Sequence, residues 1–287
     1  MSEMDAPADD SFRWLNTPRW FLWEGGFLLM AQAQGVVPPH AHHAIQIVVG
    51  LDRHVAIRGQ QGDWQHGRGV IVRPDEVHSF NASGATGAML FVDPESFEGT
   101  WLRAALTREI TLVPEARLAS SIGEFRTFDE RPFESLDVSA LIRHCVHALS
   151  PGAPPLRRLD PRVTTVLGSI RGSDDLRISL ADAAARAFLS PSRFAHLFKQ
   201  QLGLPFSRYM LWRKLTRAML AVGSERTIAA AAHAADFADA AHLTRTFHQM
   251  FGIAPSVLMR GELAEIASPF DVSGPSPPAQ VFTSANP

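Results

Sequence analysis

The residues with the clearest potential for chemistry are histidines in two short stretches of the first hundred residues. The first stretch, residues 39–46, is PHAHHAIQ, and the second, residues 73–78, is RPDEVH. Imidazole nitrogens can bind a small molecule through hydrogen bonds or hold Zn, Fe, Ni or Cu. Three interpretations therefore compete: an effector pocket, a metal site, or strand-end histidines with structural hydrogen bonds. The residues concerned are His40, His42, His43, Gln46 and His78.

These stretches resemble the two motifs of the cupins, a β-barrel family in which His-x-His, a following Glu and a later His can hold a divalent metal. His40, His42, Gln46 and His78 occupy the four positions, and Gln46 stands where that family has Glu. A neutral amide is a poorer ligand than a carboxylate. We therefore expect effector binding and no cofactor, with a divalent transition metal at these four residues as the alternative.

The surrounding sequence predicts a frame of short strands that would position the histidines. Apolar runs alternate with glycine-containing turns, which is typical of a small barrel or sandwich. The clearest strands span residues 27–32, 44–49, 54–58, 69–72 and 88–92. Residues 58–62, RGQQG, predict a hairpin turn. Beyond Pro94 the pattern changes to amphipathic helix, over residues 96–106 and 135–149. The aromatic residues Trp20, Trp23, Phe27 and Trp64 are candidates for pocket lining or core.

Charge is distributed unevenly along the chain. Residues 1–154 carry 12 Lys and Arg against 19 Asp and Glu, a net charge of −7, and residues 155–262 carry 15 against 8, a net charge of +7. A basic region beside an acidic one favours a polyanionic partner for the basic region. A solvated basic helical bundle without such a partner is the alternative.

Length and composition predict an α+β protein of two domains, because single cores rarely exceed about 250 residues. We expect a cupin-like effector-binding barrel at 12–94, a helical segment at 95–150, a linker at 151–159 and an all-α domain at 160–262. The acidic residues 1–11 and the Pro- and Ser-rich residues 268–287 are expected to be disordered.

Cellular location is predicted from what the sequence lacks. Cys145 is the only cysteine and lies in an apolar stretch, where a small buried side chain is expected rather than a catalytic thiol. No run approaches the roughly 20 apolar residues of a membrane span, and the acidic N-terminus is unlike a secretion signal. We therefore expect a cytoplasmic protein with no membrane partner.

Residues 188–210 and 237–259 are two copies of one pattern, 49 positions apart. Phe188, Phe198, Gln200, Gly203, Ser207 and Met210 recur as Phe237, Phe247, Gln249, Gly252, Ser256 and Met259. Each copy follows a short alanine-rich stretch, so each predicts helix, tight turn, second helix and glycine stop. This is the outline of a helix-turn-helix, at 180–201 and at 228–251. The second turn has Asp236 in place of the usual glycine, and Asp tolerates the left-handed conformation better than most residues.

The second helix of each copy predicts a buried face and an exposed face. Ser190 and Asp239 are the expected caps. The predicted inward residues are Phe194, Leu197, Phe198 and Gln201 in one copy and Leu243, Thr246, Phe247 and Met250 in the other. Outward side chains can contact bases or phosphates, although a solvated face is the alternative for any single residue. A helix predicted at 206–222 joins the copies, with Arg208, Arg213, Lys214 and Arg217 outward. The candidate DNA-binding residues are Ser192, Arg193, Ala195, His196, Lys199, Ala240, Ala241, His242, Thr244, Arg245 and His248, with Arg208 and Arg213 from the joining helix.

Residues 160–261 resemble the AraC/XylS family of bacterial transcription regulators. The resemblance is carried by SLADAAARAFLSPSRFAHLFKQQLG, by residues 213–219 and by FADAAHLTRTFHQMFGIAPS. It implies a seven-helix DNA-binding domain with two helix-turn-helix units and a dimer surface on the helices at 96–106 and 135–149. The implied base-contacting positions are Ser192, Ala195, His196, Ala240, Ala241, Thr244 and Arg245, where the alanines depart from the polar residues often found there.

Together with these patterns, the resemblance implies a bacterial, nucleoid-associated transcription regulator that is not an enzyme. The expected partners are double-stranded promoter or operator DNA, a small-molecule effector and a second copy of the chain, with RNA polymerase as a further candidate. The competing hypotheses are a metal-dependent cupin enzyme or metal sensor fused to a DNA-binding domain, and an adaptor that does not bind DNA.

Overall fold

The computed structural model describes residues 12–23, 25–106, 108–131, 138–149, 159–171, 173, 175–225, 227–266 and 280–282. The predicted tail at 1–11 and nearly all of the predicted linker lie outside these residues. The chain forms two compact units, one of residues 1–154 and 247–287 and the other of residues 155–246. We call them the sheet unit and the helical unit.

The larger sheet of the sheet unit has the strand order β11-β8-β5-β10-β3-β2-β12-β13, and β1 also pairs with β3. All of its pairs are antiparallel except β12 with β2. The strands are β1 (Arg13–Trp14), β2 (Arg19–Trp23), β3 (Gly26–Gln34), β5 (Ile45–Gly50), β8 (Gly69–Val72), β10 (Thr86–Val92), β11 (Ile110–Val113), β12 (Glu262–Glu265) and β13 (Gln280–Phe282).

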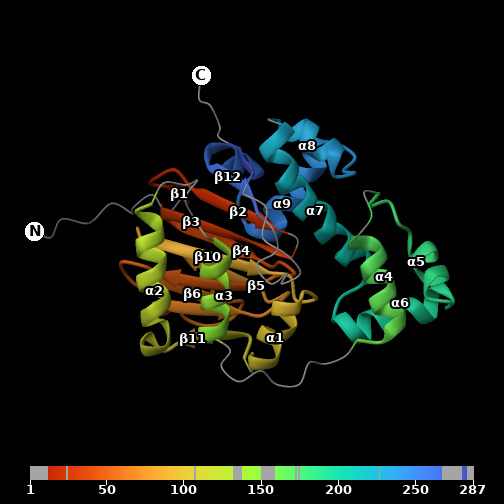
Figure 1. Cartoon of the computed structure of the whole chain (residues 1–287), viewed down its shortest axis with the longest axis horizontal. Helices are drawn as coiled ribbons and strands as arrows, with labels where there is room; N and C mark the ends of the chain where they lie inside the picture. Colours follow the sequence, from red (N-terminus) through yellow and green to blue (C-terminus); the bar gives the residue numbers. More distant parts are fainter. Residues whose placement is uncertain are drawn as a thin grey trace, which may run out of the picture. The chain divides into compact units, whose positions relative to one another are not determined.

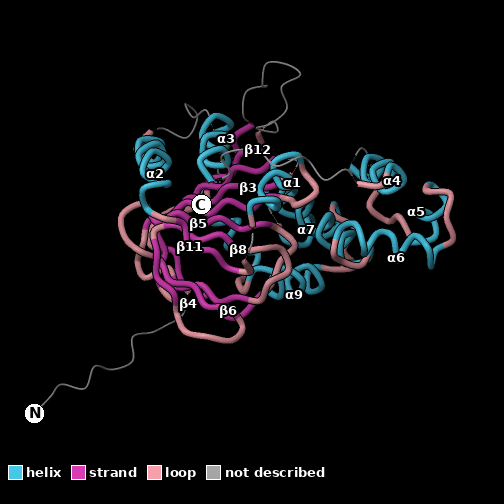
Figure 2. Tube along the Cα trace, turned by 90° about the horizontal axis from the view of Figure 1, so that it is seen from below, coloured by secondary structure: helices cyan, strands magenta, loops and turns pink. Residues whose placement is uncertain are grey.

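The smaller sheet has the order β4-β9-β6-β7 and lies against the larger one (Figure 2). Its strands are β4 (Val36–His40), β6 (Val55–Gly59), β7 (Gln65–Gly67) and β9 (His78–Asn81). Every residue of β5 is buried, because the larger sheet is covered on both faces. Strands covered on both faces appear in the sequence as continuous apolar runs rather than as alternating patterns.

The five predicted strands are confirmed as β3, β5, β6, β8 and β10, and the predicted hairpin joins β6 to β7. Strand β4 was not predicted, because Pro38 and Pro39 are typical of loops. The register of β4 against β9 shifts between Val37 and His40, and such an irregularity accommodates prolines in a strand. The predicted disorder of 268–287 is wrong at residues 280–282, because β13 pairs with β12.

In the described part of the sheet unit the helices are α1 (Phe97–Ala105), α2 (Glu115–Asp129), α3 (Val138–Leu149), the end of α9 (Ala240–Phe251) and the short 3-10 helix η2 (Pro255–Arg260). Helices α2 and α3 lie side by side across the larger sheet (Figure 1). Ser96 begins α1 by accepting a hydrogen bond from the Gly99 amide at 3.0 Å. Cys145 is fully buried on α3, as predicted, and burial raises the pKa of its thiol to about 12, so it stays protonated.

The helical unit contains two helix pairs joined by a long helix. The helices are α4 (Pro161–Arg171), α5 (Leu180–Arg186), α6 (Pro191–Leu202), α7 (Phe206–Glu225), α8 (Ile228–Ala234) and α9 (Ala240–Phe251), and residues 247–251 of α9 are part of the sheet unit. The rings of Phe194, Phe198, Phe206 and Tyr209 pack around α6 and α7. The compact helical unit ends at Thr246, whereas the predicted DNA-binding domain extends to residue 262 and so includes a segment that packs with the sheet unit.

The two helix pairs are related by a shift of 48 residues before the turn and of 49 after it. Before the turn, Leu189 N donates to Ala184 O at 3.0 Å, and Phe237 N donates to Ala232 O at 2.9 Å, which is a shift of 48. After the turn, the caps Ser190 and Asp239 differ by 49. The second turn is therefore one residue longer. Phe188 (φ 54°) therefore corresponds to Asp236 (φ 57°) and not to Phe237 as the repeat indicated. The two phenylalanines also lie in different environments, because Phe188 is 94% exposed and Phe237 is only 6% exposed.

Candidate functional site

Four of the predicted site residues meet between the two sheets of the sheet unit. His40 ends β4 and lies opposite His78, the first residue of β9. Gln46 lies on β5, and His42 lies in the loop before that strand. One ring nitrogen from each of the three histidines lies within 4.8 Å of the others. We call His40, His42, His78 and Gln46 the histidine cluster.

Backbone carbonyls fix where the protons of these rings lie. His40 Nδ1 is 2.8 Å from Pro38 O, His42 Nδ1 is 3.1 Å from Ala44 O, and His78 Nδ1 is 2.9 Å from Glu76 O. A carbonyl oxygen only accepts hydrogen bonds, so each Nδ1 carries a proton. In a neutral imidazole the Nε2 atom is then an acceptor.

The rings are neutral at physiological pH. Burial lowers the pKa of His40 to about 4, with further lowering from His78. Burial and the neighbouring His78 and His40 lower the pKa of His42 well below its ordinary value, and burial also lowers the pKa of His78. The structural hydrogen bonds that were one of the three interpretations of these histidines are therefore present. They leave the Nε2 atom of each ring without a proton.

The fourth member of the cluster brings another acceptor to the same point. Gln46 Oε1 is 3.0 Å from His42 Nε2 and 2.8 Å from His78 Nε2. Acceptors so close together need either a hydrogen-bond donor or a cation between them. The Gln46 amide supplies two donors if its NH₂ group is turned toward the two rings, and a bound metal ion would supply a cation. The cluster therefore has the donor atoms that a transition metal requires.

His43 faces away from the cluster. Its Nδ1 is 2.9 Å from Asp75 Oδ2 and its Nε2 is 3.0 Å from Glu95 Oε2. Burial opposes the charge of His43, but Glu95 and Asp75 outweigh burial and raise the pKa of this ring to about 10. Burial also raises the pKa of Glu95, to about 7, while His43 favours its carboxylate form. His43 thus joins its loop to the start of α1. Glu95 was not among the predicted site residues, because it lies 52 residues from His43 in the chain.

Aromatic rings enclose the histidine cluster. Phe91 meets the His42 ring edge-on at 5.0 Å between centroids and stacks on Phe27 at 4.3 Å. Of the aromatic residues proposed from the sequence, Trp20, Trp23 and Phe27 are buried. Trp64 is half-buried instead, beneath the guanidinium of Arg58.

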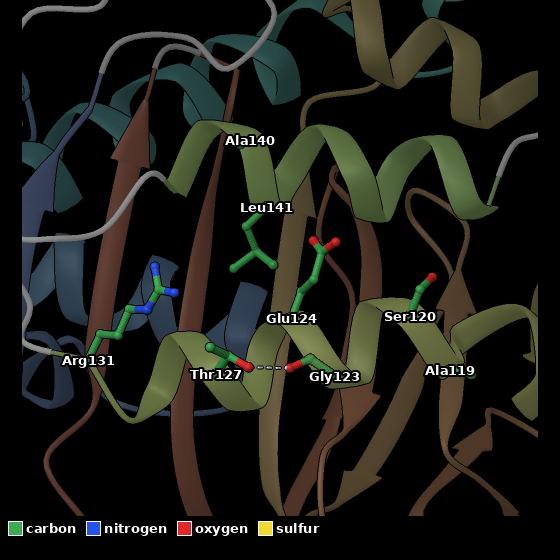
Figure 3. Close-up of a pocket in the computed structure, with 8 residues that line it drawn as sticks. All are labelled: Ala119, Ser120, Gly123, Glu124, Thr127, Arg131, Ala140 and Leu141. Atoms are coloured by element: carbon green, nitrogen blue, oxygen red, sulfur yellow. Dashed lines mark hydrogen bonds between the residues drawn. The ribbon is translucent and has the colours of Figure 1, made fainter.

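A hollow of about 480 Å³ lies between α2 and α3, away from the histidine cluster (Figure 3). Gly123, Thr127 and Leu141 are among its lining residues. His144 of α3 joins the helices, with contacts to Glu124 Oε1 at 3.3 Å and Ser120 Oγ at 3.1 Å. The apolar side chains of α3 are buried within the sheet unit.

The first candidate recognition helix, α6, has the predicted ends and faces. Ser190 accepts from the Arg193 amide, and Gly203 ends the helix with φ 92°. Phe194 and Phe198 are buried, whereas Leu197 and Gln201 are half-buried. The candidate contact residues Ser192, Arg193, His196 and Lys199 are exposed, and Ala195 is half-buried.

The second candidate recognition helix, α9, shows the same division. Asp239 Oδ1 accepts from the His242 amide at 2.6 Å, which confirms the predicted cap. The four predicted inward residues are buried. Ala241, Thr244, Arg245 and His248 are exposed, and Ala240 and His242 are half-buried.

The joining helix α7 differs from the prediction. Arg208 is exposed, but Arg213, Lys214 and Arg217 are half-buried rather than outward, because α7 packs against helices on both sides. Lys214 Nζ donates to Asp236 O at 2.9 Å and so supports the left-handed turn before α9. Arg213 is therefore less accessible to DNA than the sequence indicated.

Comparison with known proteins defines the class of the C-terminal region. Residues 183–261 match a family model described as a helix-turn-helix domain. The arabinose operon regulatory proteins of Salmonella typhimurium and Escherichia coli are each 32% identical over 88 residues, which are 30% of this chain. The transcriptional activator RhrA of Rhizobium meliloti is 34% identical over 85 residues. This region is therefore similar to the DNA-binding domains of AraC/XylS regulators, in agreement with the resemblance seen in the sequence. The matched segments span less than a third of these relatives.

The fold as a whole is similar to that of ToxT from Vibrio cholerae. The TM-score is 0.53 at 9% identity, over 87% of this chain and 98% of ToxT. The similarity supports a sheet-rich N-terminal part followed by a helical part. No helix in the described residues is long and apolar enough to span a membrane.

Proposed function

We propose that this protein is a one-component transcription regulator that binds double-stranded DNA through two helix-turn-helix units. The main support for this proposal is the pair of helices α6 and α9. Each helix has a capping residue and a buried apolar face, and each exposes polar side chains such as His196 and Arg245. The helical unit, residues 155–246, holds 14 Lys and Arg against 7 Asp and Glu, a net charge of +7. Such a charge favours phosphate contacts.

The sheet unit is the sensor in this proposal, a cupin-like barrel that receives a ligand at the histidine cluster. His43 belongs to its frame, because both ring nitrogens already have carboxylate partners. We assign no catalysis to the barrel. The relatives that match the C-terminal region are regulators, and Gln46 stands where a metal-dependent cupin enzyme would have a carboxylate. A second copy would pair through the outer faces of α2 and α3, beside the hollow between them.

A second candidate function, metal sensing, is favoured by the convergence of acceptors in the cluster. His40, His42 and His78 would hold a first-row transition metal through Nε2, with Gln46 as a neutral oxygen ligand. The rings must draw closer, because two nitrogens at about 2.1 Å from one ion lie no more than about 4.2 Å apart. ToxT has been solved with an aromatic butenoic acid. An anionic ligand suits these neutral rings less well than a cation does.

DNA binding is tested with the full chain, since residues 247–265 are part of the sheet unit. We expect the protein to retain duplexes from a randomised pool, with an affinity that falls steeply between about 50 and 200 mM salt, because the release of condensed cations from DNA gains less free energy at higher salt. The absence of salt-dependent binding to any duplex would refute the proposed function.

Metal sensing is tested separately by titrating metal-free protein with Co²⁺. We expect a visible absorption band that saturates at one ion per chain and disappears in His78→Ala, whereas His54→Ala, at an exposed histidine, retains it. An organic effector would be favoured if the band is missing from the parent protein.

A further inference from the structure

The histidine cluster has a cover that comes from neither sheet. The Phe251 ring stacks on the His42 ring at 5.9 Å with an interplanar angle of 29° and lies 5.7 Å from Phe91 and 5.8 Å from Phe27. Phe251 is the last residue of α9, and residues 247–287 belong to the same compact unit as the sheets. The end of the second candidate recognition helix is therefore a wall of the proposed ligand site.

Gly252, the next residue, lies directly on β4. A Cβ atom added to it would be 2.5 Å from Val37 Cγ1 and 3.2 Å from His40 Nδ1. The chain then returns to the larger sheet, where Glu262 N donates to Pro18 O at 2.9 Å and Ile266 N to Leu22 O at 2.8 Å. The β12 pairing thus keeps the end of α9 beside the cluster.

The cluster is inaccessible while this turn is in place. His40 is 7% exposed, His42 2% and His78 1%. Backbone hydrogen bonds hold the surrounding strands together. Residues 247–252 belong to neither sheet and meet the cluster through the Phe251 ring and the close approach of Gly252 to β4. They can therefore move away from the cluster without breaking the pairing of any two strands.

We propose that residues 247–252 are the gate of the histidine cluster. Ligand entry then requires the last turn of α9 to separate from β4 and from His42. The regulatory role of the gate rests on the proposed function. A ligand that keeps the gate open would free the end of the second candidate recognition helix. Because coupling is reciprocal, DNA that binds only the free helix would strengthen ligand binding.

The repeat supplies a matched control for this gate. Gly203 and Gly252 end the two recognition helices, with φ values of +92° and +70°. Alanine is strained at both positions, because both lie in the left-handed region. A Cβ at Gly203 meets nothing within 4 Å, whereas one at Gly252 collides with β4. Any effect of Gly252→Ala beyond that of Gly203→Ala therefore reports the contact with β4.

The test is the rate at which diethyl pyrocarbonate modifies individual histidines of the full chain, followed by peptide mass spectrometry. His54, whose side chain is 55% exposed, is the internal reference. In the parent protein we expect His40, His42 and His78 to react at least tenfold more slowly than His54. Gly252→Ala should accelerate their modification at least fivefold, and Gly203→Ala less than twofold.

Phe251→Leu keeps an apolar side chain but removes the ring above His42, and it should also accelerate modification if Gly252→Ala fails to fold. Circular dichroism establishes that each variant is folded. Equal rates in the parent and both gate variants would overturn the gate. The measurement needs neither DNA nor ligand, so it distinguishes failure of the gate from failure of the proposed function.

Discussion

Glu95 and Glu115 each contact a histidine, but only the first of these pairs is buried. Glu95 meets His43 at 3.0 Å with both side chains nearly inaccessible, whereas Glu115 meets His54 at 2.8 Å with both more than half exposed. Removing one partner of a buried pair leaves the other charge uncompensated, at a cost of about 3–5 kcal/mol. We expect Glu95→Gln to lower the free energy of unfolding by about 3 kcal/mol in urea titrations and Glu115→Gln to have little effect. Equal losses would show that burial of the His43 pair is unimportant.

The lowered pKa of His40 makes the free energy of unfolding depend on pH. Its folded-state pKa of about 4 lies below the ordinary value of 6.5, so the folded protein excludes a proton that the unfolded chain binds. The contribution of neutral His40 is present above pH 6.5 and is lost as the pH falls toward 4. Between pH 7 and 5 this amounts to roughly 2 kcal/mol. We expect His40→Gln to flatten the decline of unfolding free energy over this range, and an unchanged slope would contradict the assignment.

Helical periodicity was sufficient to predict the two candidate recognition helices, but not the residue-by-residue correspondence between them. The buried and exposed faces of α6 and α9 follow from residue spacing, and so do the caps at Ser190 and Asp239. The longer second turn could not be read from the repeat, because the identical Phe188 and Phe237 concealed the extra residue. Likewise, spacing marked Lys214 as outward, although its partner is the Asp236 carbonyl.

Arg245 on α9 and Lys199 on α6 should have different effects on DNA recognition. A bidentate arginine–guanine contact is worth about 1–3 kcal/mol of base discrimination, whereas a lysine–phosphate contact strengthens binding to all sequences alike. We expect Arg245→Ala to relax preference at one base pair in selections on randomised duplexes, and Lys199→Ala to weaken binding without changing preference. An unaltered preference in Arg245→Ala would locate specificity elsewhere, first at His196.

At the scale of the whole molecule, the sequence predicted the members of the histidine cluster but not their cover. His40, His42, Gln46 and His78 follow strand patterns that are local in the chain. Phe251 lies about 200 positions away, and local periodicity contains no information on which distant strand or helix closes a site. For the same reason β12, which pairs with β2, could not be predicted.

Self-association is expected to depend on the hollow between α2 and α3. Gly123 lines it, and a Cβ at Gly123 meets nothing within 4 Å; the same is true of Gly168 on α4. Gly123→Arg should therefore fold and obstruct a second copy, raising the dimer dissociation constant at least tenfold, about 1.4 kcal/mol. Sedimentation equilibrium measures this, with Gly168→Arg as the control. Equal dimer stability in both variants would exclude this surface.

The parallel pairing of β12 with β2 has a consequence for how the protein is made. Strand β2 (Arg19–Trp23) emerges early from the ribosome, but its partner, Glu262–Glu265, follows only after the helical unit has been synthesised. Until then one edge of an apolar strand has open hydrogen-bonding groups, and such an edge is a template for aggregation. A chain cut off at Gly261 would keep all six helices of the helical unit and yet leave this edge uncovered. We expect it to collect in inclusion bodies, so that only chains that contain β12 remain in solution.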